Sequence, residues 1–157
     1  MSLAAPQAKA LAFLRIAVGL LFLIFAQYKL TSTRFIHEGM ATYISRFIEH
    51  GCYPFMHHFL TDIILPHSVF FGTVVAISEL LIGLSLVTGV QVRWASLGGL
   101  VMMLLYLFSS NYPGAHAPFW QYFGASLDHS VLALCFLAFL IGYPGTAWTL
   151  RPGKSIR

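Results

Sequence analysis

The stretch VFFGTVVAISELLIGLSLVTG, residues 69–89, decides the class of fold. It is long enough to cross a bilayer as a helix, because about 20 apolar residues span the hydrocarbon layer. Its only ionisable side chain is Glu79. A carboxylate at the middle of a bilayer costs about 3 kcal/mol on insertion scales, so it must be protonated, paired or directed into a cavity. Glu79 therefore predicts a partner inside the protein.

The rest of the chain has the composition of an integral membrane protein. Of its 157 residues, 58% are hydrophobic and 9% are charged, whereas about a quarter are charged in soluble domains. Four segments have the length of a membrane span: residues 11–30, 69–90, 94–110 and 127–143. The sequence thus predicts an all-α fold, a single membrane domain over residues 1–157 that forms a four-transmembrane-helix bundle in the lipid bilayer.

The two longer connections between these segments are not ordinary polar loops. Residues 35–65 carry apolar side chains at spacings of three and four, with a break at Gly51 and a new helix start at Pro54. This pattern is typical of amphipathic helices that lie on the bundle or in the interface. Residues 111–126 place Trp120 and Tyr122 among prolines and glycines. This second connection predicts an aromatic belt at the membrane interface or a lid over a site.

The basic residues indicate how the chain is oriented. The larger group falls on the side of both termini: Lys9, Arg93, Arg151, Lys154 and Arg157. The smaller group falls on the other side: Lys29, Arg34 and Arg46. The positive-inside rule then puts both termini in the cytoplasm, and the predicted location is a bacterial plasma membrane. Because the basic residues do not cluster, no nucleic-acid partner is expected.

Three buried charges are predicted to point into the bundle. Arg15 and Lys29 share a helix face with Gly19, and Glu79 shares one with Gly83. Small residues let helices approach closely in lipid, so these faces are the expected helix contacts. The depth of each residue along its helix then predicts two clusters. Arg15 is expected to pair with Glu79 on the inner side, and Lys29 with Asp128 near the outer surface. Lys29 is expected to lie too far from Glu79 to reach it.

These clusters have two interpretations. In the first, the Arg15–Glu79 pair only fixes the register of two helices, as buried ion pairs can do. Lys29 then only extends its ammonium group to the membrane interface, as long side chains do. In the second, the clusters carry chemistry. The catalytic residues would be Glu79, Arg15 and Lys29. The substrate-binding residues would be Asp128, His129, Trp120 and Tyr122. No metal site is predicted, because no H-x3-H or H-E-x-x-H spacing occurs and metal sites need several convergent ligands.

Two stretches resemble the DoxX family of small four-helix membrane proteins. LRIAVGLLFLIFAQYKL, residues 14–30, is similar to the family's R-x3-G helix that closes with G-x-x-K, although Ala26 stands where glycine is more frequent. ELLIGLSLVTGVQVRWA, residues 79–95, is close to its E-x3-G-x5-G-x3-R segment. The resemblance implies a four-helix membrane fold and membrane redox work, including subunits that resemble thiosulfate:quinone oxidoreductase.

This resemblance favours a redox-associated membrane subunit that binds a quinone-like or lipid-soluble substrate inside the bundle. Quinone reduction consumes protons, which suits buried ionisable groups. No motif for a further cofactor is visible, so the electrons would come from a protein partner. Two alternatives stay open: a non-catalytic anchor or assembly factor that docks a partner or a second copy, and a small transporter or haem- and metal-handling protein that uses the outer histidines.

Overall fold

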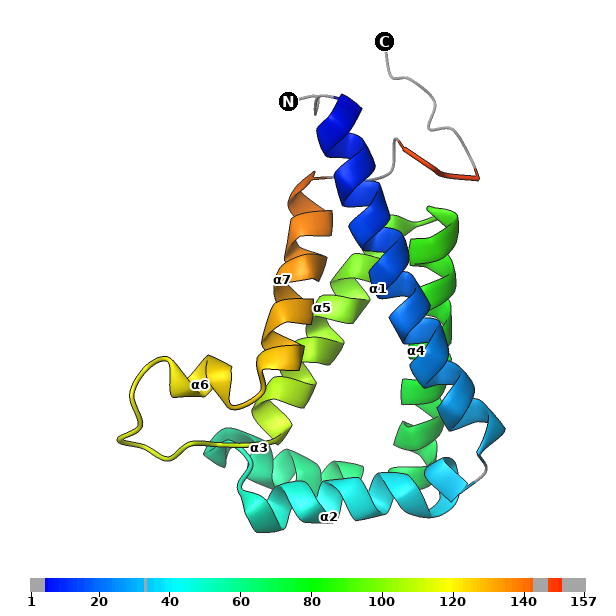
Figure 1. The fold of residues 1–157 in the computed structure, drawn as a ribbon. Coiled ribbons are helices and arrows are strands. Elements are labelled where there is room, and N and C mark those ends of the chain that lie inside the picture. The colour runs from blue at the N-terminus through cyan, green and yellow to red at the C-terminus, as the bar shows by residue number, and fades with distance from the viewer. Residues whose placement is uncertain (1–4, 33, 143–146, 151–157) are drawn as a thin grey trace.

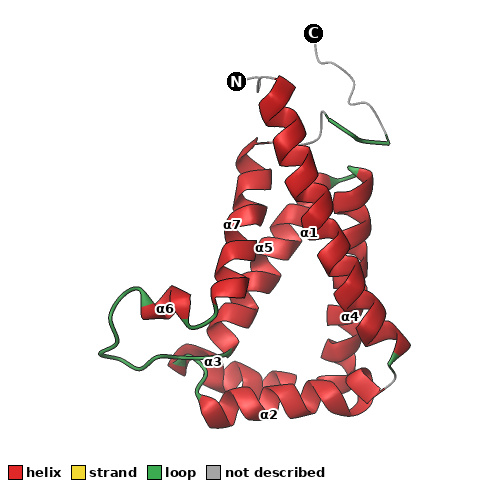
Figure 2. Cartoon of the chain, viewed as in Figure 1, coloured by secondary structure: helices red, strands yellow, loops and turns green. Residues whose placement is uncertain are grey.

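The fold is a set of helices, and the computed structural model describes residues 5–32, 34–142 and 147–150. Every regular element in these ranges is helical (Figure 2), which confirms the all-α prediction. Three helices are long and apolar enough to cross a membrane: α1 (Ala5–Thr31), α4 (Ser68–Thr88) and α5 (Val92–Ser109). A shorter apolar helix, α7 (Leu127–Gly142), ends where the described residues stop. A fourth span formed by α7 stays a prediction.

The long helices are arranged as two pairs. α1 packs along α4, and α5 packs along α7, with a smaller contact between α4 and α5 (Figure 1). The pairs lie closer together where α1 begins and α7 ends, which we call the terminal end, and they diverge toward the opposite end (Figure 1). The site described below lies between the diverging pairs.

A helical layer closes that opposite end. It consists of the π-helical turn η1 (Phe35–Gly39), α2 (Met40–His50), α3 (Pro54–His58) and the π-helical turn η2 (Phe59–Ile64), and we call Phe35–Ile64 the cap. α2 ends at Gly51, whose φ of +104° suits glycine, and α3 begins at Pro54. Ile44 and Leu60 are buried in the cap's own apolar cluster. The predicted helices over residues 35–65 are therefore confirmed.

Glycines let the helices within each pair approach closely. A Cβ atom on Gly83 would lie 2.8 Å from the side chain of Leu23, and one on Gly19 would lie 2.9 Å from Cβ of Leu86. Gly99 of α5 has the ring of Phe136 of α7 directly against it. These contacts are the small-residue packing expected of helices in lipid. They also fix the register in which α1 and α4 run past each other.

Candidate functional site

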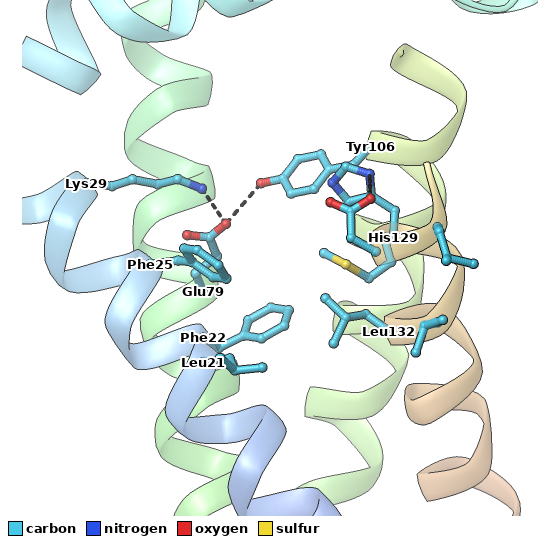
Figure 3. A pocket seen from close by; sticks show the side chains of 12 residues that line it. Leu21, Phe22, Phe25, Lys29, Glu79, Tyr106, His129 and Leu132 are labelled. Carbon is cyan, nitrogen blue, oxygen red and sulfur yellow. Dashed lines mark hydrogen bonds and ion pairs between the residues drawn. The ribbon is translucent and has the colours of Figure 1, made fainter. Parts of the chain in front are cut away.

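Glu79 lies at the centre of a buried polar cluster. α4 places it midway along the helix, where only 3% of its surface is exposed. One carboxylate oxygen, Oε1, pairs with Nζ of Lys29 from α1 and accepts a hydrogen bond from the Tyr106 hydroxyl of α5 at 3.2 Å (Figure 3). The other oxygen, Oε2, is buried and has no hydrogen-bond partner among the residues that the structure describes. Three helices therefore converge on one carboxylate whose second oxygen remains unpaired.

This arrangement shows that the predicted pairing of Arg15 with Glu79 is wrong. Gly19 faces Leu86, and Gly83 faces Leu23, so the antiparallel register places Glu79 about level with Ala26. Lys29 is then only about 4.5 Å away along the helix axis, whereas Arg15 is about 16 Å away, at 1.5 Å per residue. The prediction failed because depth was counted from the ends of the apolar segments, and α1 extends beyond α4 at the terminal end.

Arg15 has a different environment at the terminal end. Its side chain is fully buried, and Nη2 donates to the backbone oxygen of Trp148 at 2.8 Å and to that of Ala147 at 3.4 Å. Nη1 lies against Gly89, a residue with φ of +77° where a Cβ atom would also collide with Thr149. Arg15 thus holds the segment 147–150 against the end of α4.

A cavity of about 670 Å³ lies beside Glu79, between all four long helices. Its wall is mainly apolar, with five polar side chains. The apolar lining residues are Leu21, Phe22, Phe25, Met103, Leu127, Val131 and Leu132. The polar ones are Lys29, Glu79, Tyr106, Asp128 and His129. On α1 and α5 the polar lining residues lie nearer the cap than the apolar ones, and on α7 Asp128 and His129 lie nearer the cap than Val131 and Leu132. The polar groups therefore gather toward the cap end of the cavity, where Leu127 at the start of α7 stands beside them.

The predicted pairing of Lys29 with Asp128 is also wrong, because Lys29 pairs with Glu79. Asp128 and His129 nevertheless line the same cavity, at the start of α7. Nδ1 of His129 lies 3.4 Å from Oδ1 of Asp128, and the His129 ring stands 5.5 Å from the ring of Tyr106. The structure thus brings three predicted residues, Lys29, Glu79 and His129, to one site, with Asp128 at its edge.

Tyr106 is a site residue that sequence reasoning missed. It stands in an apolar span, where a tyrosine is easily taken for a packing residue. A buried tyrosine hydroxyl usually finds a hydrogen-bond partner. A search for hydroxyl groups within the spans would have identified it as a candidate partner of Glu79.

The other two predicted substrate-binding residues do not line the cavity. Trp120 is 67% exposed. The Tyr122 hydroxyl donates to the backbone oxygen of Gly114 at 2.8 Å, and its own backbone oxygen accepts from the Tyr53 hydroxyl at 3.0 Å. Burial, with smaller contributions from Tyr122 and Tyr112, raises the pKa of Tyr53. These contacts bind the loop to the cap.

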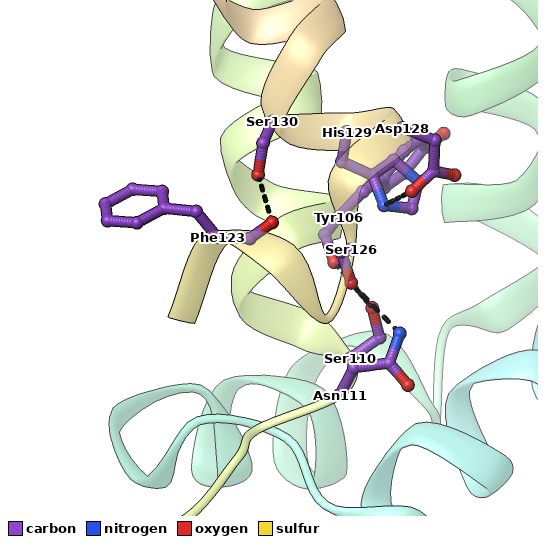
Figure 4. Close-up of polar contacts among 8 residues, drawn as sticks. All are labelled: Tyr106, Ser110, Asn111, Phe123, Ser126, Asp128, His129 and Ser130. Atoms are coloured by element: carbon purple, nitrogen blue, oxygen red, sulfur yellow. Dashed lines mark hydrogen bonds and ion pairs between the residues drawn. The ribbon is translucent and has the colours of Figure 1, made fainter. Parts of the chain in front are cut away.

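The loop around α6 (Gln121–Gly124) is also fixed at its base. Asn111 donates to the hydroxyl of Ser126 at 2.9 Å, and Ser130 donates to the backbone oxygen of Phe123 at 2.9 Å (Figure 4). The Phe123 ring points away from these bonds, and it and Phe119 are exposed. This geometry presents aromatic side chains outward, next to α7.

No group of three His, Cys, Asp or Glu side chains arranged to hold a metal ion occurs among the described residues. The site instead offers the remaining N–H groups of Lys29 as donors, the Tyr106 hydroxyl, which donates to Glu79, and an acceptor on Glu79 Oε2. It can therefore hold the polar head of an organic molecule whose remainder is apolar.

The fold and this site define an integral membrane protein with a buried ion pair on the wall of an amphipathic cavity. A model of the DoxX family matches residues 10–111, and the chain belongs to this family. The match includes Lys29, Glu79 and Tyr106 but ends before α7. No match was found among curated proteins or among solved structures.

Proposed function

We propose that this DoxX-family protein binds a quinone-like, lipid-soluble molecule in the cavity, with the polar head at Lys29, Glu79 and Tyr106. The observation that carries the proposal is the unpaired Oε2 of Glu79 on the wall of a cavity. A buried polar atom without a partner costs about 1 to 3 kcal/mol. A ligand hydroxyl that donates to Oε2 would remove this cost.

The donors and acceptors suit both redox forms of a quinone. Lys29 keeps N–H groups beyond the one that pairs with Glu79 and can donate to a quinone carbonyl, and Oε2 of Glu79 can accept from a quinol hydroxyl. The Tyr106 hydroxyl can donate to the ligand if it turns away from Glu79, to which it donates in the structure. Conversion of the quinone to the quinol takes two electrons and two protons. In this proposal a partner protein supplies the electrons, and the ionisable groups at the cavity hold or pass the protons. Asp128 and His129 would contact the head from α7.

The membrane orientation belongs to the same proposal. With both termini in the cytoplasm of a bacterial plasma membrane, the polar end of the cavity and the cap face the outside. An electron-donating partner would then meet the exposed side of the cap. Arg15 and Trp120 have no place in the site, because Arg15 binds the segment 147–150 and Trp120 lies outside the cavity lining.

A second candidate function is a non-catalytic anchor or assembly factor. It is favoured by exposed aromatic side chains on both the cap and the α6 loop, such as Phe55 at 65% and Phe119 at 79%. Exposed apolar patches of this kind mark protein or membrane contacts. A partner that co-purifies in equal amount, with no small molecule extracted, would favour this function.

The proposed function can be tested by quinone binding to the purified protein in lipid nanodiscs. The probes are 2,3-dimethoxy-5-methyl-1,4-benzoquinone and its quinol, whose hydroxyl can donate to Oε2, and empty nanodiscs correct for partition into lipid. Lys29→Met should weaken binding at least tenfold, because it removes a donor and the partner of Glu79. Lys9→Met makes the same change at an exposed position of the same helix and should have no effect. Equal binding by both variants and the wild type would contradict the proposal.

A further inference from the structure

We propose that the ligand enters the cavity sideways from the bilayer, through an opening between α1 and α7, and that an apolar tail of the ligand occupies this opening. We call the opening the portal and define it by Leu21, Phe25, Leu127 and Val131. The inference rests on the proposed function. It adds the substrate class, an amphiphile with a hydrogen-bonding head and a membrane-embedded tail.

The first observation is where the cavity wall is exposed. The portal residues are all lining residues, and their exposed fractions are 44% for Leu21, 51% for Phe25, 62% for Leu127 and 48% for Val131. The walls from α4 and α5 are closed in comparison, since Glu79 of α4 and Met103 of α5 are each only 3% exposed. The cavity therefore reaches the molecular surface along the edge between α1 and α7.

The second observation is the way in which these two helices separate. Toward the terminal end they touch, where the Phe22 and Phe136 rings meet edge to face at 5.3 Å and Leu11 packs on Gly142. Nearer the cap, α1 follows α4 while α7 follows α5, so they diverge (Figure 1). The portal is thus a consequence of the two-pair packing of the bundle.

The third observation is the chemistry of the portal. All four portal residues are apolar: Leu21 and Phe25 belong to α1, which is long and apolar enough to cross a membrane, and Leu127 and Val131 belong to the shorter apolar helix α7, which we also place in the bilayer. Exposed apolar side chains at this depth contact lipid tails, which are as apolar as leucine. The polar residues Lys29, Asp128 and His129 stand at the cap side of the cavity. A ligand in this site would place its head near the cap and its tail toward lipid, as it does in a leaflet.

The test compares two quinones with the same head, one without a tail and one with a decyl tail, in lipid nanodiscs. Val131→Trp adds bulk at the portal. Leu134→Trp adds the same residue type at a position that is also exposed on α7, at 65%, but does not line the cavity. Val131→Trp should weaken binding of the decyl quinone at least tenfold and change that of the tail-less quinone less than twofold. Leu134→Trp should change neither.

Unchanged binding of the decyl quinone to Val131→Trp would overturn the portal, and so would an equal loss for both quinones. In either case binding of the tail-less quinone to the wild type, and its loss in Lys29→Met, would still support the proposed function. If the wild type binds neither quinone, the proposed function fails and the portal with it. Val131→Phe provides the same test if the tryptophan variant does not elute as a folded species in gel filtration.

Discussion

Two cations on one face of α1, Arg15 and Lys29, are directed into the protein and have opposite surroundings. Arg15 ends on backbone oxygens of the segment 147–150 and forms no ion pair with another described residue. Lys29 ends on Glu79, at the wall of a cavity. Lys29 meets the requirement that a charge inside a membrane protein be paired or solvated, whereas Nε and Nη1 of Arg15 have no hydrogen-bond partner among the described residues. The comparison teaches that the hydrogen-bond partner of a buried cation indicates its role. Arg15 binds neutral backbone oxygens and is structural, whereas Lys29 binds Glu79, which is ionisable and faces a cavity, and is available for chemistry.

The largest expected effect follows from removing the cation at the cavity. Lys29→Met leaves Glu79 buried without its counter-charge, which should lower the free energy of unfolding by about 3 to 5 kcal/mol, or force the carboxyl to take up a proton. Unfolding in mixed detergent micelles measures this loss. The second substitution Glu79→Gln should restore much of it. If Lys29→Met were as stable as Lys9→Met, the ion pair would not have its assigned role.

The next effect concerns the other cation. Arg15→Met removes a hydrogen bond of 2.8 Å to the backbone oxygen of Trp148 and a long, weak one of 3.4 Å to that of Ala147. The short charged bond is worth about 1.5 to 3 kcal/mol. We expect a loss in that range, together with faster hydrogen exchange at the amide of Leu150, which bonds to the backbone oxygen of Thr88 at 3.0 Å. Quinone binding by the folded fraction should stay unchanged. Loss of binding in a folded Arg15→Met protein would break the distinction between the two cations.

A smaller effect is expected at the third member of the cluster. Tyr106→Phe removes one hydrogen bond to Glu79 and keeps the ring against His129. The free energy of unfolding should fall by only about 1 kcal/mol, because Lys29 still pairs with the same oxygen. Quinone binding should weaken more clearly than stability. Tyr53→Phe, which removes a hydroxyl bonded far from the cavity lining, is the matched control for binding.

The same comparison shows how much the sequence could predict. Apolar length predicted the three membrane-capable helices α1, α4 and α5, and helical periodicity with Gly51 and Pro54 predicted the helices of the cap. Small residues correctly indicated that α1 and α4 meet face to face. These features depend on the local pattern of apolar and small residues and on the cost of exposing polar groups to lipid. Both can be evaluated from the sequence alone.

The pairing within the site could not be predicted in the same way. It depends on the register of α1 against α4, which is set by the contacts of Gly19 and Gly83 with particular side chains. The cavity depends on the divergence of two helix pairs, a tertiary property with no local signal. Asp128 and His129 line the same cavity as Lys29 because the start of α7 and the end of α1 lie toward the same end of the bundle, although Lys29 pairs with Glu79 and not with Asp128.

The most direct test of the account is a pair of double-mutant cycles on the free energy of unfolding, one for Lys29→Met with Glu79→Gln and one for Arg15→Met with Glu79→Gln. Residues in contact couple by about 0.5 to 3 kcal/mol, whereas residues more than about 10 Å apart add within about 0.5 kcal/mol. The account predicts strong coupling for Lys29 with Glu79 and additivity for Arg15 with Glu79. Additivity in the first cycle, or strong coupling in the second, would contradict it.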